Sequence, residues 1–255
     1  MIDIHAHILP QIDDGAQSKT MAFEMCEMAA RGGVTDIIAT PHMMDLYASD
    51  EFLEKVNIRV DFMNRLMEEK GIDLRVHKGA EVYASSDILY SPDLRPYTLA
   101  GSRYLLFEFD FGEATLNYAK EVASVILSQD LIPVLAHPER YRFTLSNYEN
   151  INRLADCGVL FQCNLGSLTG ELGKKESVLA REMLNAGAVS FLATDAHRVE
   201  YRNTDIPAML KSIKEYKKKV DYTKIEALLT ENPAKLLRGE HVENPSFTTL
   251  KKKLF

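Results

Sequence analysis

Histidines and carboxylates stand at the ends of short apolar runs in this sequence. Five of its seven histidines have this position, and the exceptions are His77 and His241. The residues assigned to this group are His5, His7, Asp14, His42, Glu81, Glu108, His137, Asp195 and His197. If the runs are parallel strands, their carboxyl ends meet at one face, where barrel enzymes build their active sites. Imidazoles and carboxylates gathered there predict a metal centre.

Each of these residues alone has a more ordinary interpretation. A lone His42 or His137 is typical of a hydrogen-bonded structural histidine, and Glu81 alone is typical of a salt-bridge partner. Glu108 differs because it lies inside the apolar run 105–109. A buried carboxylate is costly unless a cation or hydrogen bonds compensate it. The shared placement favours the metal centre, since independent structural roles would not put these residues at corresponding ends.

The nine side chains are too many for one ion. With about four to six ligands for each ion and one carboxylate shared, they would hold two or three divalent metal ions. The mixture of nitrogen and oxygen donors, without a thiolate, suits Mn, Fe or Zn but does not choose among them.

Two arginines indicate which reaction such a centre would catalyse. Arg140 follows His137 by three residues, and Arg202 follows His197 by five. Closely spaced metal ions favour in-line displacement at phosphorus, and planar guanidinium groups suit bidentate contact with phosphate. The ordinary interpretation of either arginine alone is a surface ion pair. None of the three cysteines begins a Cys-x5-Arg phosphate-binding loop. The sequence therefore predicts phosphate hydrolysis that uses metal rather than thiolate chemistry.

The elements that must position these residues alternate between strand and helix. We expect strands at residues 2–5, 36–40, 74–80, 103–109, 132–136, 159–164 and 189–194. We expect helices at residues 18–31, 51–70, 117–129 and 174–185. A capping box at Ser146 and Glu149 predicts the start of another helix, and Gly158 and Gly187 are expected to end helices in the left-handed conformation.

This alternation predicts the fold class. Apolar strands separated by helices imply an α/β protein with a parallel sheet buried on both faces. Roughly seven repeats without a linker favour closure into a TIM-like barrel in a single domain. A doubly wound open sheet is the alternative, but the Gly-x-Gly-x-x-Gly turn typical of dinucleotide-binding members is absent from the sequence.

Composition limits the partners and the compartment. The formal charge of −7 argues against a nucleic-acid backbone binder. No run of 18 apolar residues and no secretory signal is evident, and three loosely spaced cysteines suggest reduced thiols, so we expect a cytoplasmic protein. Residues 239–255 are polar and basic, and we expect a solvated tail. The alternative for this tail is a weak contact with an acidic partner or the inner membrane surface.

The motifs that carry the nine residues resemble the polymerase-and-histidinol-phosphatase (PHP) superfamily over about residues 1–238. The closer resemblance is to its bacterial tyrosine-phosphatase branch, which is encoded with capsule and exopolysaccharide genes. The motifs are Asp3-Ile4-His5-Ala6-His7, Ile12-Asp13-Asp14-Gly15, Thr40-Pro41-His42, Gly79-Ala80-Glu81, Phe107-Glu108-Phe109, His137-Pro138-Glu139-Arg140 and Asp195-Ala196-His197. Histidinol-phosphatase relatives commonly carry histidine at the positions of Asp14 and Glu108, so carboxylates there match the tyrosine-phosphatase branch.

The resemblance implies a distorted seven-stranded β/α barrel (the PHP fold) at residues 1–238, followed by a tail at residues 239–255. It implies three metal ions, and we expect Mn, with Fe or Zn as alternatives. The implied ligand sets are His5, His7, Glu81 and Asp195 for the first ion, Glu81, Glu108 and His137 for the second, and Asp14, His42 and His197 for the third. Arg140 and Arg202 match the arginines that contact the substrate phosphate.

The resemblance also implies the reaction and its partner. Activated water would attack phosphorus directly, without a phosphoenzyme, on the phosphotyrosine tail of a bacterial tyrosine autokinase. The product would modulate capsule or exopolysaccharide synthesis. The nearest alternative is a small-molecule phosphatase of the same superfamily, such as a histidinol phosphatase. A nuclease is disfavoured by the negative charge, and a non-catalytic metal-binding module by the filled ligand positions beside two arginines.

Overall fold

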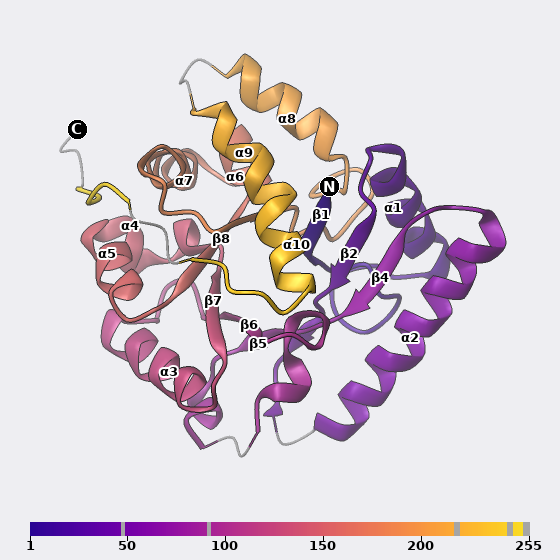
Figure 1. Cartoon of the computed structure of the whole chain (residues 1–255), viewed down its shortest axis with the longest axis horizontal. Coiled ribbons are helices and arrows are strands. Elements are labelled where there is room, and N and C mark those ends of the chain that lie inside the picture. Colours follow the sequence, from indigo (N-terminus) through magenta and orange to yellow (C-terminus); the bar gives the residue numbers. More distant parts are fainter. Residues whose placement is uncertain (47–48, 91–92, 217–219, 244–246, 252–255) are drawn as a thin grey trace.

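Parallel strands form the centre of the structure, and helices surround them (Figure 1). The computed structural model describes residues 1–46, 49–90, 93–216, 220–243 and 247–251. The strands are β1 (Ile2–Ala6), β2 (Asp36–Ala39), β3 (His42–Met43), β4 (Arg75–Lys78), β5 (Glu81–Tyr83), β6 (Tyr104–Glu108), β7 (Ile132–Ala136), β8 (Leu160–Asn164) and β9 (Phe191–Ala193). They form a mixed α/β domain, which confirms the predicted class.

The strands belong to two parallel sheets. One has the order β1-β2-β4, and the other has the order β3-β5-β6-β7-β8-β9. The sheets meet beyond the ends of β1 and β9, where Ala6 forms a parallel bridge with Ala196. There the amide of His7 donates to the carbonyl of Ala196 at 2.8 Å. Both sheets therefore bring the carboxyl ends of their strands to one region.

Two strands end earlier than the predicted bounds 36–40 and 74–80, because β2 ends at Ala39 and β4 covers only Arg75–Lys78. After β2, Pro41 removes a ladder donor, and pairing resumes only at His42 in β3. Between β4 and β5 lies Gly79, where an added Cβ would sit 2.9 Å from Ile38 and 3.1 Å from Leu99. These breaks let the chain turn just before His42 and Glu81.

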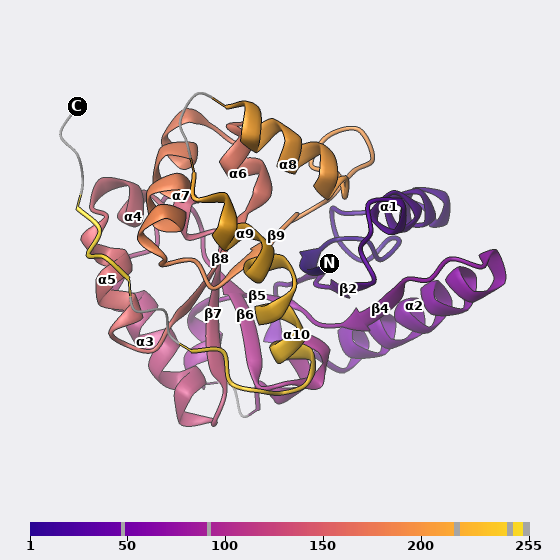
Figure 2. The ribbon, with the colours of Figure 1, turned by 45° about the horizontal axis from the view of Figure 1, so that its top comes forward.

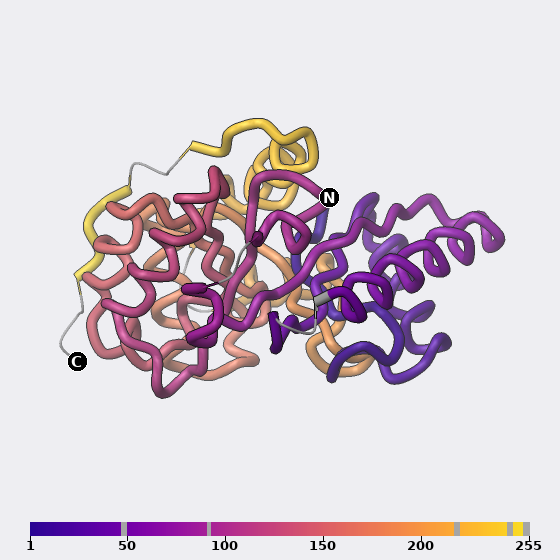
Figure 3. Tube along the Cα trace, turned by 90° about the horizontal axis from the view of Figure 1, so that it is seen from below, coloured from indigo at the N-terminus to yellow at the C-terminus, as the bar shows by residue number. Residues whose placement is uncertain are grey.

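The described helices are α1 (Lys19–Arg31), α2 (Ser49–Lys70), α3 (Leu116–Ser128), α4 (Arg142–Ser146), α5 (Glu149–Ala155), α6 (Leu165–Thr169), α7 (Lys174–Ala186), α8 (Ile206–Glu215), α9 (Tyr222–Leu229) and α10 (Glu231–Leu237). Four of the described helices, α1, α2, α3 and α7, match the predicted ranges 18–31, 51–70, 117–129 and 174–185 to within two residues. α2 packs along β4 at one side of the molecule (Figure 3). Of the described helices, none is long and apolar enough to cross a bilayer.

The helix ends confirm one prediction and correct another. Gly158 and Gly187 have φ values of +84° and +85°, as expected for glycines that end helices. The predicted capping box is wrong, because Ser146 is the last residue of α4 and its hydroxyl donates to the carbonyl of Phe143. The side chain of Asn147 instead accepts from the amide of Glu149 at the start of α5.

Two apolar clusters pack on opposite faces of the strands. The inner cluster includes Tyr104 and Leu106 of β6, whereas Leu105 and Phe107 belong to the outer cluster beneath the helices. Side chains alternate between the two faces of a strand, so Glu108 lies on the same face as Tyr104 and Leu106. Along the inner face of β6, the side chains of Tyr104 and Leu106 are therefore followed by the carboxylate of Glu108.

The C-terminal segment is mostly exposed where it is described, as expected of a solvated tail, but two buried residues anchor it, which corrects the expectation at those points. α10 and the described residues directly after it lie over the strands (Figures 1 and 2). The amide of Val242 donates to the hydroxyl of Tyr104, and that hydroxyl donates to the carbonyl of Glu240, each at 2.7 Å. Val242 and Leu250 are buried, and Asn152 pairs with the backbone of Leu250. Residues 252–255, with most of the basic run, lie outside the described residues.

Candidate metal centre

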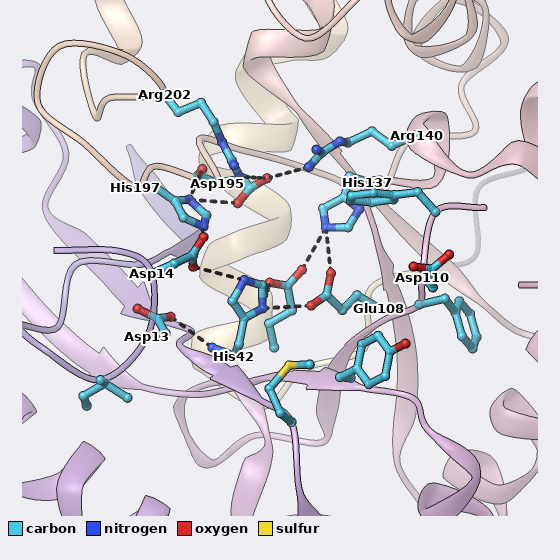
Figure 4. Close-up of a pocket in the computed structure, with 16 residues that line it drawn as sticks. Asp13, Asp14, His42, Glu108, Asp110, His137, Arg140, Asp195, His197 and Arg202 are labelled. Atoms are coloured by element: carbon cyan, nitrogen blue, oxygen red, sulfur yellow. Dashed lines mark hydrogen bonds and ion pairs between the residues drawn. The ribbon is translucent and has the colours of Figure 1, made fainter. Parts of the chain in front are cut away.

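Seven of the nine predicted histidines and carboxylates line a pocket with a volume of about 500 Å³ (Figure 4), and the other two, His5 and His7, lie against its Glu81. His5 and His7 lie at the end of β1, Asp195 and His197 follow β9, Glu108 ends β6 and His137 follows β7. His42 and Glu81 begin β3 and β5, and Asp14 lies in the loop after β1. Asp14 is exposed at the entrance, whereas His5, His7, Glu81 and Asp195 are buried. The structure therefore brings together all of the residues that the sequence singled out.

Glu81 is the centre of the cluster. Its Oε2 atom lies 3.3 Å from Nε2 of His5, 3.3 Å from Nε2 of His7 and 3.1 Å from Nδ1 of His42. Its Oε1 atom lies 2.9 Å from Nε2 of His137. One buried carboxylate thus faces four imidazoles, which is the position expected of a ligand shared between ions.

Three sets of ligand atoms lie close enough to hold an ion. They are His5 with His7 and Glu81, then His42 with Glu81 and Glu108, and finally His7 with Asp14, His42 and His197. These sets overlap the predicted ones but assign His42 differently. Nδ1 of His42 lies 2.8 Å from Oε1 of Glu108, whereas Nε2 of His137 lies 3.6 Å from Oε2 of Glu108.

The donor chemistry fits divalent cations. Nε2 of His5 and Nε2 of His7 face each other at 3.2 Å, although both also point to Glu81. Oε2 of Glu81 and Nδ1 of His42 are buried and make no well-formed hydrogen bond among the described residues. Converging lone pairs of this kind are costly without a positive charge between them, and metal ions supply that charge.

The protonation equilibria show how strongly the cluster attracts positive charge. Burial opposes protonation of His42, but Glu108 and Glu81 outweigh it and raise the pKa of His42 to about 11. Burial also opposes protonation of His7, but the carboxylates of Asp13 and Glu81 outweigh it and raise the pKa of His7 to about 9. Burial would raise the pKa of Glu81, but the imidazoles hold it well below its usual range. Protons therefore occupy part of the cluster when no metal ion does.

His197 behaves differently from its neighbours. Burial and the positive charge of His7 lower the pKa of His197 to about 4. Its ring stacks on that of His7 with centroids 3.9 Å apart, and its Nε2 atom lies 3.4 Å from Oδ1 of Asp14. A neutral imidazole is the form that binds metal ions, so His197 is ready to act as a ligand.

Polar side chains outside the cluster orient the histidines, and the sequence interpretation did not assign them. Oδ2 of Asp13 lies 2.7 Å from Nδ1 of His7 and accepts from the amide of His42. Oε1 of Gln162 in β8 lies 2.8 Å from Nδ1 of His5. Such contacts select the ring nitrogen that faces a metal ion. A glutamine inside the otherwise apolar run 159–163 was the available signal for Gln162.

The two predicted arginines converge on the same carboxylate. Nη2 of Arg202 lies 2.6 Å from Oδ2 of Asp195, and Nη1 of Arg140 lies 3.6 Å from the same atom. The two arginines approach Asp195 from opposite sides (Figure 4). Both line the pocket, and each side chain is about a fifth exposed. Burial would raise the pKa of Asp195, but His5 and Arg202 lower it strongly. The arginines therefore place two positively charged guanidinium groups beside the carboxylate cluster.

Backbone strain concentrates at this site. His137, Asp195 and Arg202 have φ values of +33°, +51° and +48°, a region that residues other than glycine rarely adopt. Such conformations cost free energy and persist where the surroundings hold them, commonly at functional sites. Each of the three stands where the chain leaves a strand or turns back to the pocket.

The fold and this site define a class, namely α/β proteins with an imidazole–carboxylate centre at the carboxyl ends of parallel strands. Residues 1–238 match the family described as "Capsular polysaccharide synthesis, CpsB/CapC". The chain belongs to this family.

Similar proteins span the whole chain. The tyrosine-protein phosphatase YwqE of Bacillus subtilis is 33% identical over 100% of this chain and 99% of its own length. The putative tyrosine-protein phosphatase CapC of Staphylococcus aureus is 32% identical over 95% of this chain and 93% of its own length. The tyrosine-protein phosphatase CpsB of Streptococcus pneumoniae is 30% identical over 94% of this chain and 99% of its own length.

A solved structure has the same architecture. It comes from crystal structures of YwqE and of CpsB from Streptococcus pneumoniae, which are described as metal-dependent tyrosine phosphatases. It aligns with a TM-score of 0.82 and 31% identity, covering 99% of this chain and 100% of that one. A β-aspartyl dipeptidase from Fervidobacterium islandicum, at 14% identity and a TM-score of 0.57, shares the fold alone.

Proposed function

We propose that this protein is a metal-dependent protein-tyrosine phosphatase that acts in capsule or exopolysaccharide synthesis. The observation that carries the proposal is the convergence of Arg140 and Arg202 beside the imidazole–carboxylate cluster (Figure 4). Full-length relatives named tyrosine-protein phosphatases support the substrate class. Two guanidinium groups and a metal centre in one pocket are suited to a phosphate ester.

The proposed cofactor is a group of two or three divalent ions, with Mn expected and Fe or Zn as alternatives. The residues that would hold them are His5, His7, Asp14, His42, Glu81, Glu108, His137, Asp195 and His197. When bound, such ions generate a nucleophile from water at neutral pH and neutralise charge on phosphate oxygens.

The protein's own residues orient the ester. Arg140 and Arg202 each use a nitrogen against Asp195 and keep further N–H groups for phosphate oxygens. Asp195 fixes both guanidinium groups before substrate arrives, so little ordering is needed on binding. Because the substrate leaves as a phenolate, a fair leaving group, a dedicated general acid is less important than for an alkyl ester.

The proposed architecture around this site is a distorted seven-stranded barrel at residues 1–238. Support comes from the bridge between Ala6 and Ala196, which joins the two sheets on one side. On the other side β2 and β4 run on into β3 and β5 after short breaks, and the amide of Glu81 donates to the carbonyl of Pro41. Residues 239–255 would then form a tail attached to the barrel.

The proposed partner is the phosphotyrosine-bearing tail of a bacterial tyrosine autokinase, and the proposed compartment is the cytoplasm. The family's association with capsular polysaccharide synthesis supports this context, and the three unpaired cysteines suit a reducing environment. The net charge of −7 speaks against nucleic acid as a partner. A weak contact of the basic tail with a membrane or an acidic partner remains part of the proposal.

The test combines metal analysis with two substrates. Elemental analysis of the purified protein should find two or three ions per chain, and chelation should abolish hydrolysis of a phosphotyrosine peptide. Hydrolysis of histidinol phosphate in preference to the peptide would contradict the proposal and favour a small-molecule phosphatase. Activity that survives complete removal of metal would contradict the metal-dependent mechanism.

Arg140→Ala separates phosphate binding from metal binding. Loss of one fixed cation beside the phosphate should lower kcat/KM by roughly 100-fold or more. Metal content should stay unchanged, because no predicted ligand is removed. Arg153→Ala, on the exposed side of α5, is the matched control and should leave both quantities at the wild-type value. Full activity of Arg140→Ala would remove this arginine from the mechanism.

A further inference from the structure

Phe111 is the most exposed phenylalanine of the pocket, which is otherwise rich in charge and also includes the partly buried Tyr83. Phe111 is 38% exposed and lines the pocket between Asp110 and Arg140. Phe111 does not belong to the outer apolar cluster, whereas Phe107 and Phe109 of the same segment do. A single exposed phenyl ring is ordinary on a protein surface, but inside a pocket it offers an apolar face to a bound molecule.

The ring is held in place by its surroundings. Oδ1 of Asp110 accepts from the amides of Gly112 and Glu113, and the carbonyl of Phe111 accepts from the amide of Arg142 at 2.8 Å. The ring centroid lies 5.4 Å from that of His137, which it meets edge to face, and 5.6 Å from that of Tyr141. A side chain fixed on both its backbone and its ring can serve as a preformed surface.

The ring also adjoins the proposed phosphate position. Cζ of Arg140 lies 4.2 Å from the centroid of Phe111, while Nη1 of the same arginine faces Asp195. A phosphate held by Arg140 and Arg202 would therefore lie within reach of the ring of Phe111. Met44, which is largely exposed, lines the same pocket and extends its apolar surface.

We propose that Phe111 is the specificity-determining residue that contacts the aromatic ring of the substrate and so favours aryl over alkyl phosphate esters. The inference rests on the proposed phosphatase function and names the group that the site selects. An aromatic pair contributes about 0.5–1.5 kcal/mol beyond the area it buries, which corresponds to roughly a two- to tenfold preference in binding.

A simpler role for Phe111 would be to position Arg140. That role predicts a different result, because every phosphate ligand would then bind less tightly when the ring is removed. Contact with the substrate ring predicts that only ligands with an aromatic group are affected. Ligands that cannot be hydrolysed separate the two roles without using turnover.

The experiment measures binding of phenylphosphonate and methylphosphonate by calorimetry to the metal-containing protein. Wild type should bind phenylphosphonate more tightly, and Phe111→Leu should lose roughly a two- to tenfold preference while methylphosphonate binding stays constant. Phe111→Tyr should keep the preference. Tyr90→Ala, at an exposed aromatic residue outside the pocket, is the matched control and should bind both ligands like wild type.

Two results would overturn the inference. Equal weakening of both phosphonates in Phe111→Leu would assign Phe111 to positioning Arg140, and an unchanged preference would leave it no role in recognition. The proposed function is tested separately: it would fail if the wild-type protein did not hydrolyse a phosphotyrosine peptide. In kinetics, the same variant should raise KM for a phosphotyrosine peptide and leave inhibition by inorganic phosphate unchanged.

Discussion

The side chains on the inner face of the central strands are apolar near the amino-terminal end of each strand and charged near or just after its carboxyl-terminal end. In β6, Leu106 lies in the inner apolar cluster, and Glu108, two residues later, lies in the candidate site. Beyond β9 the same step leads from Ala193 to Asp195. The amino-terminal part of each inner face supplies apolar burial, and the carboxyl-terminal part supplies charge. Mutations of the apolar residues should therefore lower the free energy of unfolding, and mutations of the charged residues should lower metal binding and activity.

Glu81→Gln should have the largest effect on the charged end. Glutamine keeps the size of the side chain but removes the negative charge that faces four imidazoles. We expect loss of bound metal and a fall in phosphatase activity of more than about 100-fold. Elemental analysis and peptide hydrolysis measure these changes. Glu54→Gln, exposed on α2, is the control, and retention of metal by Glu81→Gln would contradict the central role of this carboxylate.

Leu106→Ala should break the apolar end instead. Removal of a fully buried leucine leaves a cavity and should lower the free energy of unfolding by about 2–5 kcal/mol. The metal content of the folded protein should remain that of wild type. Urea unfolding with elemental analysis provides the measurement, and Leu127→Ala, at a partly exposed position on α3, should change stability much less. Metal loss in folded Leu106→Ala would show that the two ends are coupled.

Gln162→Leu should weaken the centre without removing a predicted ligand. It deletes the acceptor that faces Nδ1 of His5 and the donor to the side chain of Asn164. Groups that orient a ligand typically contribute roughly 10- to 100-fold in metal affinity, and we expect a loss in that range. Competition with a metal-binding indicator measures it. Wild-type affinity in this variant would show that His5 needs no such support.

Metal loading should release protons from the charged end. The pKa values of His7 and His42, about 9 and 11 in the metal-free protein, mean that both rings are protonated at pH 7. A ring must lose its proton to bind a metal ion, so metal affinity should rise as the pH increases from 7 toward 9. The expected slope is roughly tenfold per pH unit for each proton released. Calorimetry in buffers of different ionisation enthalpy counts the protons, and a count of zero would contradict these pKa values.

The positions of the predicted ligands followed from the sequence because charged side chains are unusual at the ends of buried strands. His42, Glu81 and Glu108 stand out for this reason, and the structure places them around one pocket. The breaks at Pro41 and Gly79 were harder to predict. The break at Gly79 depends on Ile38 and Leu99, which approach it from other parts of the chain.

Other contacts depend on geometry that residue types do not contain. Asp13 and Asp14 are adjacent and chemically identical, yet Asp13 faces Nδ1 of His7 and Asp14 faces His42 and His197. Their separation requires the tight turn at Gly15, where an added Cβ would lie 2.2 Å from the carbonyl of His7. The sequence interpretation assigned Asp14 to the ligands, whereas the contact of Asp13 with His7 was found only in the three-dimensional structure.

The anchoring of the C-terminal segment has a practical consequence for anyone who shortens this chain. The match to the family ends at residue 238, but Val242 reaches the inner apolar cluster and shares the Tyr104 hydroxyl with Glu240. A version cut at residue 238 would open the base of the strands to water and leave that phenol without both backbone partners. Expression vectors designed from the family boundary should therefore extend past Val242 to Leu250, whose backbone pairs with Asn152.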